Sequence, residues 1–125
     1  MIKQIAQEKM PISKLIHFDK LDTDVEFIVG KNAKENFEVI DYACDHHLWF
    51  HVKGCPSPHV IACIDDNIDR KDMRYIVKQG AVLCKQHSNY ANAKNVEIVY
   101  TRVCNVQKTD IMGSVSIEHE KTVVI

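Results

Sequence analysis

One stretch of the sequence, DHHLWFHVKGCPSPHV at residues 45–60, concentrates the side chains that could do chemistry. It holds four of the seven histidines, the single Trp and two of the three prolines. Three kinds of site use such residues: imidazoles that bind a metal, rings on which nucleic-acid bases stack, and a Cys/His pair that acts as a nucleophile. An ordinary strand followed by a tight turn also fits the pattern.

Strand alternation divides the first half of this stretch into two faces. Leu48, Phe50 and Val52 form an apolar face that is typical of a core. The other face carries rings and a cation, which suits stacked bases beside a phosphate, and its members are His47, Trp49, His51 and Lys53. The alternative is that Trp49 packs under a helix or loop, because Trp is highly buried on average.

A zinc site formed by His47, His51 and His59 is another hypothesis. These residues are not accompanied by a C-x-x-C pair or by paired histidines on a helix, which are the usual spacings of zinc ligands. Cys55 lies between His51 and His59, but no recognisable motif supplies an orienting acid or an oxyanion hole. We therefore expect no enzyme activity, no bound metal and no cofactor.

The composition bounds the class of protein. The chain has 125 residues, of which 46% are hydrophobic and 26% charged, so it is long enough to form one soluble domain, residues 1–125, with its own core. It contains no apolar run long enough to cross a membrane, and its first residues lack the apolar segment of a secretory signal. Its five cysteines are widely spaced and odd in number, which favours a reducing, cytoplasmic location.

The elements that position these residues follow from periodicity and turn signals. Apolar alternation predicts early strands at 14–18 and 25–30, and Phe37, Ile40 and Cys44 share one side of a short helix over 33–43. A hairpin of strands 48–52 and 59–64 follows. After a helix over 69–88, we expect strands at 96–103, 114–119 and 121–125. The pattern predicts an α+β fold: a mixed, mostly antiparallel sheet with one main amphipathic helix packed on it and a short second helix.

The main helix also concentrates positive charge. Asp69 is placed to cap it, and Gly80 within its apolar side indicates close packing onto the sheet. Its opposite side carries cations at spacings of three, four and seven residues: Lys71, Arg74, Lys78 and Lys85. Residues 70–108 carry a net charge of +6 in a chain whose net charge is -1. If those charges share one face, a polyanion could bind there; otherwise they form a solvated helix surface.

Three segments in order, VGKNAKENFEV, LWFHVKGCPSPHV and VEIVYTRVCNVQKTDIMGSVSI, resemble the NFACT-R domain. This domain is found in RqcH/NEMF-type proteins of ribosome-associated quality control. It also occurs in stand-alone eukaryotic proteins related to coiled-coil domain-containing protein 25. The resemblance runs from about Val25 to Ile125. Two positions depart from the family pattern: His47 stands where an acidic residue is usual, and Ser57 and Pro58 replace the Gly-Ser of the turn.

The resemblance implies an RNA-binding module for tRNA or ribosomal RNA, with ribosomal proteins as further partners and no membrane contact. The expected binding residues are Lys31, Asn32, Asn36, His51, Lys53, Ser57, His59, Arg74, Lys78, Lys85, Arg102 and Lys108. Lysines and arginines in this set would contact phosphates, and the others would give polar support. Two alternatives stay open: a module that docks on a ribosome or a partner protein without touching RNA, and a His-cluster metal-binding domain.

Overall fold

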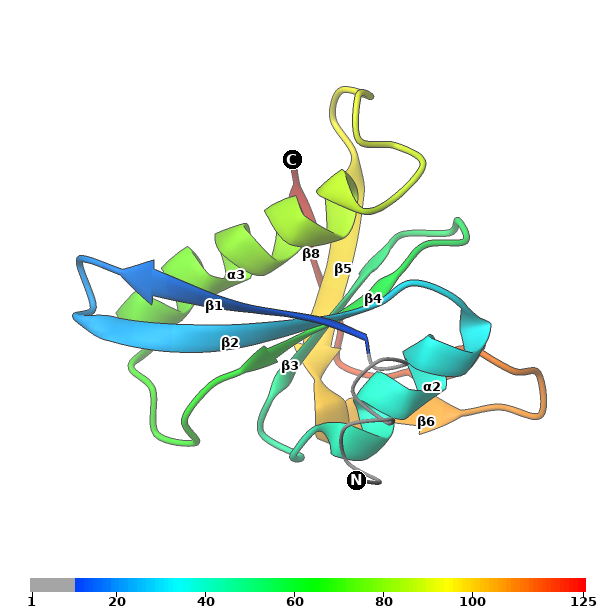
Figure 1. The fold of residues 1–125 in the computed structure, drawn as a ribbon, viewed down its shortest axis with the longest axis horizontal. Helices are drawn as coiled ribbons and strands as arrows, with labels where there is room; N and C mark the ends of the chain where they lie inside the picture. The colour runs from blue at the N-terminus through cyan, green and yellow to red at the C-terminus, as the bar shows by residue number, and fades with distance from the viewer. Residues whose placement is uncertain (1–10) are drawn as a thin grey trace, which may run out of the picture.

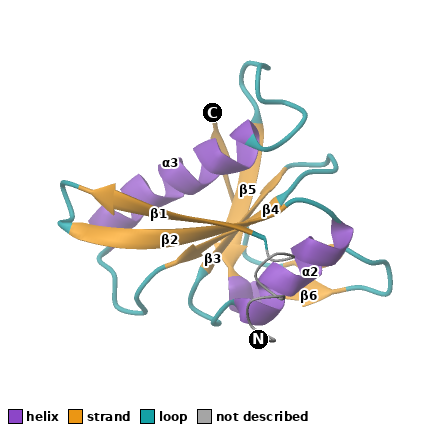
Figure 2. Cartoon of the chain, viewed as in Figure 1, coloured by secondary structure: helices purple, strands orange, loops and turns teal. Residues whose placement is uncertain are grey.

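The computed structural model describes residues 11–125, in which a six-stranded sheet carries a helix on each face (Figures 1 and 2). None of the helices in this range has the length and apolar character needed to cross a membrane. In chain order the elements are β1 (Ile12–Phe18), β2 (Thr23–Gly30), α2 (Ala33–Tyr42), β3 (Leu48–Val52), β4 (His59–Cys63), α3 (Arg70–Gln86), β5 (Glu97–Arg102), the 3-10 helix η1 (Val103–Asn105), β6 (Val106–Lys108), β7 (Val115–Ile117) and β8 (Lys121–Val124).

The large sheet has the strand order β1-β2-β4-β3-β5-β8, so β1 and β8 are its edges. All strand pairs within residues 11–125 are antiparallel. Phe50 pairs with Val60 in the β3–β4 hairpin and with Tyr100 on its other side. The expected α+β class, with a mostly antiparallel sheet and one main helix packed on it, is confirmed.

Alternation along β3 gives the sheet two buried faces. Leu48, Phe50 and Val52 pack in the core under α3. Trp49 points to the other face, where it packs with Ile61. The central strands are therefore covered on both sides, as the buried hydrophobic positions of β3 and β4 show.

Helix α3 begins and packs as expected. Asp69 caps it, because its Oδ1 accepts the Lys71 N–H at 3.0 Å. A Cβ at Gly80 would lie only 2.3 Å from Cζ of Phe50. The lack of a side chain at Gly80 therefore lets the helix approach the sheet, which offsets the low helix propensity of glycine.

Helix α2 lies on the opposite face of the sheet, and its buried side differs from the expected one. Its N-cap is Asn32, whose Oδ1 accepts the Glu35 N–H at 2.9 Å. Asn36 and Val39 are its fully buried residues; of the expected row Phe37, Ile40 and Cys44, Ile40 is partly buried and packs against the core around Trp49. Cys44 lies beyond the end of the helix and is exposed. The ring of Phe37 is covered by Lys108, whose Nζ lies 4.9 Å from the ring centroid.

A second small sheet completes the α2 side of the molecule. The expected strand at 96–103 ends at Arg102, and η1 turns the chain into the β6–β7 hairpin. Asn105 supports this turn, because its Nδ2 donates to the buried Thr101 hydroxyl at 3.1 Å. The hairpin closes a second core, formed by Val39, Trp49, Ile61, Val99, Val103 and Val106. Sequence periodicity did not predict η1 or β6, because both are only three residues long.

Candidate nucleic-acid interface

The turn between β3 and β4 is built by local hydrogen bonds and one glycine. Gly54 has a φ of 69°, a conformation that favours glycine. The Ser57 hydroxyl accepts the Val52 N–H at 2.9 Å and donates to the carbonyl of Pro58 at 3.0 Å. Ser57 thus holds the turn together. In this chain its hydroxyl has a structural use in addition to the expected ligand contact.

Asn36 fastens this turn to α2. Its Oδ1 accepts the main-chain N–H of His59 at 3.0 Å, and its Nδ2 donates to the Ser57 carbonyl at 3.4 Å. A Cβ at Gly30 would lie 2.6 Å from the same Oδ1, so Gly30 leaves room for the amide. Asn36 is only 7% exposed. Asn36 therefore holds the turn in place, and its expected contact with RNA stays a prediction.

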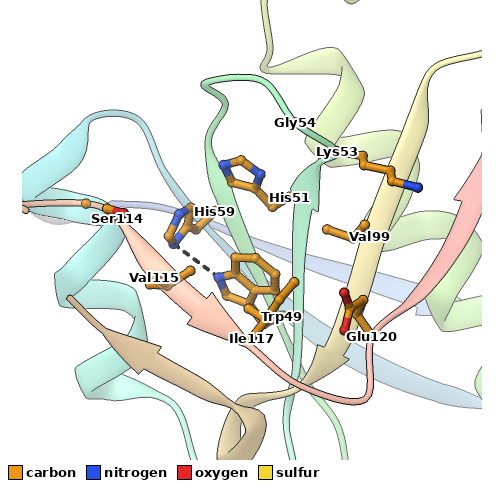
Figure 3. A pocket seen from close by; sticks show the side chains of 11 residues that line it. Trp49, His51, Lys53, Gly54, His59, Val99, Ser114, Val115, Ile117 and Glu120 are labelled. Atoms are coloured by element: carbon orange, nitrogen blue, oxygen red, sulfur yellow. Dashed lines mark hydrogen bonds between the residues drawn. The ribbon is translucent and has the colours of Figure 1, made fainter.

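Three rings lie beside this link (Figure 3). The Nε1 of Trp49 donates to Nδ1 of His59 at 3.1 Å, and the His51 ring is stacked on Trp49 with centroids 5.6 Å apart. Trp49 and His59 are each 1% exposed, whereas His51 is half-buried. Trp49 therefore packs inside the domain, as the alternative interpretation proposed. His59, which was expected among the binding residues, is also buried.

Burial sets the protonation of these histidines. It lowers the pKa of His59 to about 3, with the neighbouring His51 adding to the effect. Burial also lowers the pKa of His51. His59 is neutral near pH ~7, and since its Nδ1 accepts a hydrogen bond, its proton lies on Nε2.

Two adjoining hollows open on the α2 side of the hairpin. The smaller, of about 280 Å³, lies beside Trp49, His51, Lys53 and His59, with Glu120 on its border (Figure 3). The larger, of about 570 Å³, is bordered by four segments: 31–36 at the start of α2, 56–58 of the turn, 87–89 after α3, and 112–114. His51, Gly113 and Ser114 border both hollows. We call the two together the hairpin groove.

Gly113 brings the fourth segment close to α2. It has a φ of 82°, and a Cβ there would lie 2.8 Å from Cα of Ala33. A side chain at this position would therefore be both strained and in collision with the first turn of the helix. The wall of the groove at Ser114 depends on this close approach.

The N-terminus of α2 borders the groove. The first four N–H groups of a helix have no partner within it. In α2, Asn32 accepts those of Glu35 and Asn36, at 2.9 Å through Oδ1 and at 2.8 Å through its carbonyl. Within the described part of the chain, the N–H groups of Ala33 and Lys34 have no acceptor. These amides and the helix dipole favour an anionic group at this end of the helix.

The structure brings seven of the twelve expected binding residues to the hairpin groove. They line one or both of its hollows: Lys31, Asn32, Asn36, His51, Lys53, Ser57 and His59. The two cations among them each have an acidic neighbour, Glu35 at 4.0 Å from Lys31 and Glu97 at 3.9 Å from Lys53. Lys53 and Glu97 are both more than half exposed, so their ion pair is weak. The Glu35 side chain is only 13% exposed, and it also accepts the main-chain N–H of Lys31 at 2.9 Å.

The other five expected residues lie elsewhere. Arg74 and Lys78 are on α3, across the sheet from the core that Trp49 and α2 share. Three more cations already bind groups within the chain: Lys85 donates to the Ile125 carbonyl, Arg102 to the His46 carbonyl, and Lys108 to Asp41. The twelve residues therefore do not form one surface.

Some residues of the groove were not expected. His87, Ser88 and Asn89 follow α3, and Ser114 follows Gly113. The helix predicted over 69–88 includes His87 and Ser88. Nothing in the sequence therefore indicated that these two polar residues border a groove. Only the glycine at 113 marked the other segment as a turn.

The arrangement of the histidines and of Cys55 bears on the metal and nucleophile hypotheses. Within residues 11–125, no cluster of three or more His, Cys, Asp or Glu side chains has the arrangement of a metal site. The His51 and His59 rings have centroids 5.1 Å apart, but Nδ1 of His59 is occupied by Trp49. Cys55 is half-buried in the turn. The expectation that the protein uses no metal and no catalytic thiol stays a prediction.

Comparison with known proteins adds independent information. Residues 14–119 match the family described as NFACT protein RNA binding domain. The chain is 31% identical over 101 residues to coiled-coil domain-containing protein 25 of Mus musculus, and 30% identical to that of Danio rerio. These matches cover 78% of this chain and 49% of each relative, so the chain spans about half the length of these relatives.

A solved structure has the same fold. It is the C-terminal part of the fibronectin/fibrinogen-binding protein from Streptococcus suis, with a TM-score of 0.77 and 22% sequence identity. The match covers 93% of this chain and 45% of that one. The sequence match over residues 14–119 shows that the chain belongs to the NFACT protein RNA binding domain family, a membership that supports an RNA-binding role.

Proposed function

We propose that this domain binds structured RNA, either tRNA or ribosomal RNA, in the hairpin groove. In this proposal the domain works in the cytoplasm, in ribosome-associated quality control, and ribosomal proteins are further partners. Family membership supports RNA as the ligand. We choose the hairpin groove as the binding site because polar residues from four separate segments of the chain converge on it.

The observation that carries the proposal is the first turn of α2. Lys31, Asn32 and Ala33 lie together at the larger hollow, and the N–H groups of Ala33 and Lys34 have no acceptor within the described residues. Backbone amides at a helix N-terminus and an adjacent Lys are suited to a phosphate. The hollow of about 570 Å³ is within the range of pockets that hold small organic groups, so it can accept a nucleotide.

The groove favours contact with the RNA backbone over stacking on bases. Trp49, the largest ring near the groove, is buried and cannot serve as a stacking surface. The half-buried His51 borders both hollows, so its ring can contact an RNA group that lies in the groove. We therefore expect recognition of shape and phosphate positions, with little sequence preference.

The test is a binding titration of the whole 125-residue chain against tRNA, duplex DNA and single-stranded RNA, followed by fluorescence anisotropy. Lys31→Glu should weaken tRNA binding by about tenfold or more, since it replaces a charge-assisted contact with repulsion. The matched control is Lys71→Glu, an exposed position on α3 across the sheet. It should leave the affinity unchanged.

Two outcomes would contradict the proposal. One is a folded protein that binds none of the three nucleic acids, which would favour docking on a ribosome or partner protein without RNA contact. The other is tRNA binding that is unaffected by Lys31→Glu but lost with Arg74→Glu and Lys78→Glu. That result would place the RNA on the α3 side.

A further inference from the structure

A second groove lies on the opposite face of the sheet, between α3 and the end of β1. It has a volume of about 510 Å³ and is lined by Phe18, Arg74, Tyr75, Lys78, Gln79 and Val82. Its floor is mainly apolar, and its cations lie on the exposed surface. We call it the β1–α3 groove. No residue of the hairpin groove contributes to it.

The cations around this groove have no acidic partners within the described chain. Among residues 11–125, no carboxylate lies within 4.0 Å of a charged nitrogen of Lys20, Arg74 or Lys78. Two of these cations lie over the Tyr75 ring, Lys20 at 5.4 Å and Arg74 at 5.1 Å from its centroid. The groove therefore has, beside apolar side chains, three cations without acidic partners in the described chain, whereas the nearby carboxylates of Asp19 and Asp24 lie against His17, whose side chain alternates to the other face of β1.

The neighbouring strand is an edge. All seven residues of β1 pair with β2 on one side, and β1 has no strand on its other side in the described part of the chain. Figure 1 shows β1 beside β2, and Phe18 at the end of β1 lines the groove together with residues of α3. Its Leu15 is 70% exposed, among the most exposed large hydrophobic side chains described. Edge strands with exposed apolar residues are sites at which another strand can add.

We propose that an extended, acidic segment of a partner protein binds along β1 as a seventh strand. Its main chain would pair with the free edge of β1, as in other cases of strand addition. Its side chains would alternate between two faces. On one face an apolar side chain enters the β1–α3 groove while carboxylates meet Lys20, Arg74 and Lys78; on the other face, an apolar side chain covers Leu15.

Three features favour a peptide over a nucleic acid at this groove. The free strand edge offers main-chain hydrogen bonds that a peptide can complete and an RNA backbone cannot. Cations already lie over the ring of Tyr75, so a base would have to displace them before it could stack there. The apolar floor between Phe18 and Val82 matches a hydrophobic side chain better than a phosphate chain. This inference concerns a different surface from the proposed RNA site and does not depend on it.

The first experiment measures peptide binding to the whole chain. The probe is a fluorescein-labelled peptide in which pairs of Glu alternate with pairs of Val, so that each of its faces carries both types. The control peptide has Lys in place of Glu. Combining Arg74→Glu with Lys78→Glu should weaken the acidic peptide by about tenfold or more, and Lys71→Glu should not. Thermal melting of each variant, and an Arg74→Gln, Lys78→Gln pair, separate lost contacts from lost folding.

The second experiment locates the peptide by backbone hydrogen exchange. Strand addition should slow exchange along Ile12–Phe18 and leave the other edge, β8, unchanged. Protection confined to α3 or to β8 would overturn the proposal. Equal binding of the acidic and basic peptides would also overturn it. A third contrary result would be that tRNA displaces the peptide completely and that the Arg74→Glu, Lys78→Glu variant no longer binds tRNA. If the peptide binds a chain that lacks residues 1–10 but does not bind the whole chain, then residues 1–10 occupy the edge of β1. That result would overturn the proposal of a partner protein at this edge.

Discussion

Trp49, His59 and Asn36 form a chain of buried polar groups that joins the sheet to α2. Each hydrogen bond contributes about 1 kcal/mol net, but removing one partner leaves a buried group unsatisfied, at a cost of about 1–3 kcal/mol. No buried side-chain nitrogen or oxygen in the described residues lacks a partner. At the scale of single residues, the position of the hairpin groove therefore depends on a neutral His59 that accepts from Trp49 and is held through Asn36.

The free energy of unfolding should fall in mild acid because of His59. Its pKa is about 3 in the folded chain, against an ordinary value of 6.5. Between these pH values the unfolded chain binds the proton and the folded chain does not. The contribution of His59 to the free energy of unfolding is therefore fully present above pH ~6.5 and is lost as the pH falls. From about pH 7 to about pH 4.5 this one group should remove about 3 kcal/mol. Urea unfolding at several pH values measures this.

His59→Gln is the control for this effect, because Gln offers Trp49 an acceptor but has no titrating group. Its stability should vary much less with pH in the same range. Burial lowers the pKa of His51 as well, so a smaller slope of the same sign should remain. His17 acts in the opposite direction, since its hydrogen bond to Asp24 raises its pKa. An unchanged slope in His59→Gln would show that His59 does not cause the acid sensitivity.

The five thiols should differ widely in reactivity. Burial raises the pKa of Cys84 to about 12 and that of Cys63 to about 11, so both are protonated near pH ~8. Cys44 and Cys104 are exposed. Brief treatment with iodoacetamide followed by peptide mass analysis should find Cys44 and Cys104 alkylated and Cys84 unmodified until denaturant is added. A stable disulfide in fresh protein would contradict both the thiol state and the expected reducing location.

At the scale of elements, the contact between α3 and β3 should be intolerant of small additions. Gly80→Ala improves helix propensity by about 1 kcal/mol, yet its Cβ would lie 2.3 Å from Cζ of Phe50. We expect a net loss of about 1–3 kcal/mol in the free energy of unfolding, because overpacking of a dense core outweighs propensity. Gln86→Ala, at an exposed position of the same helix, should be neutral or slightly stabilising. Partial rescue of Gly80→Ala by Phe50→Leu would confirm the steric cause.

The elements were predictable where one physical signal dominated. Period-two alternation identified β3 and its two faces, and the Asp69 cap with its apolar side identified α3. The short elements η1 and β6 carry too few residues for a period, and their positions depend on Val103 and Val106 packing against Trp49. Seven of the twelve residues expected to bind RNA lie at one groove, and their contact with RNA stays a prediction. The sequence could not show that Arg74 and Lys78 lie across the sheet, because the face on which α3 packs is decided by tertiary contacts.

At the scale of the whole molecule, the cations among the expected binding residues are divided between two faces. The hairpin groove has the cations Lys31 and Lys53, together with neutral donors. The α3 side has Arg74 and Lys78. An RNA that occupies only the hairpin groove therefore neutralises few phosphates, and its binding depends on shape and amide donors more than on net charge. The two surfaces can be distinguished by how steeply salt weakens binding.

The salt dependence of tRNA binding should be shallow. Each phosphate neutralised by a cation contributes about -0.7 to -0.9 to the slope of log affinity against log salt. Two cations, Lys31 and Lys53, predict a slope of about -2, whereas adding Arg74 and Lys78 would make it about -3 to -4. Lys31→Glu should reduce the magnitude of the slope by about 1, and Lys71→Glu should leave it unchanged. A slope near -4 that Lys78→Glu reduces would mean that tRNA also contacts the α3 side, and the β1–α3 groove would then be part of the RNA surface.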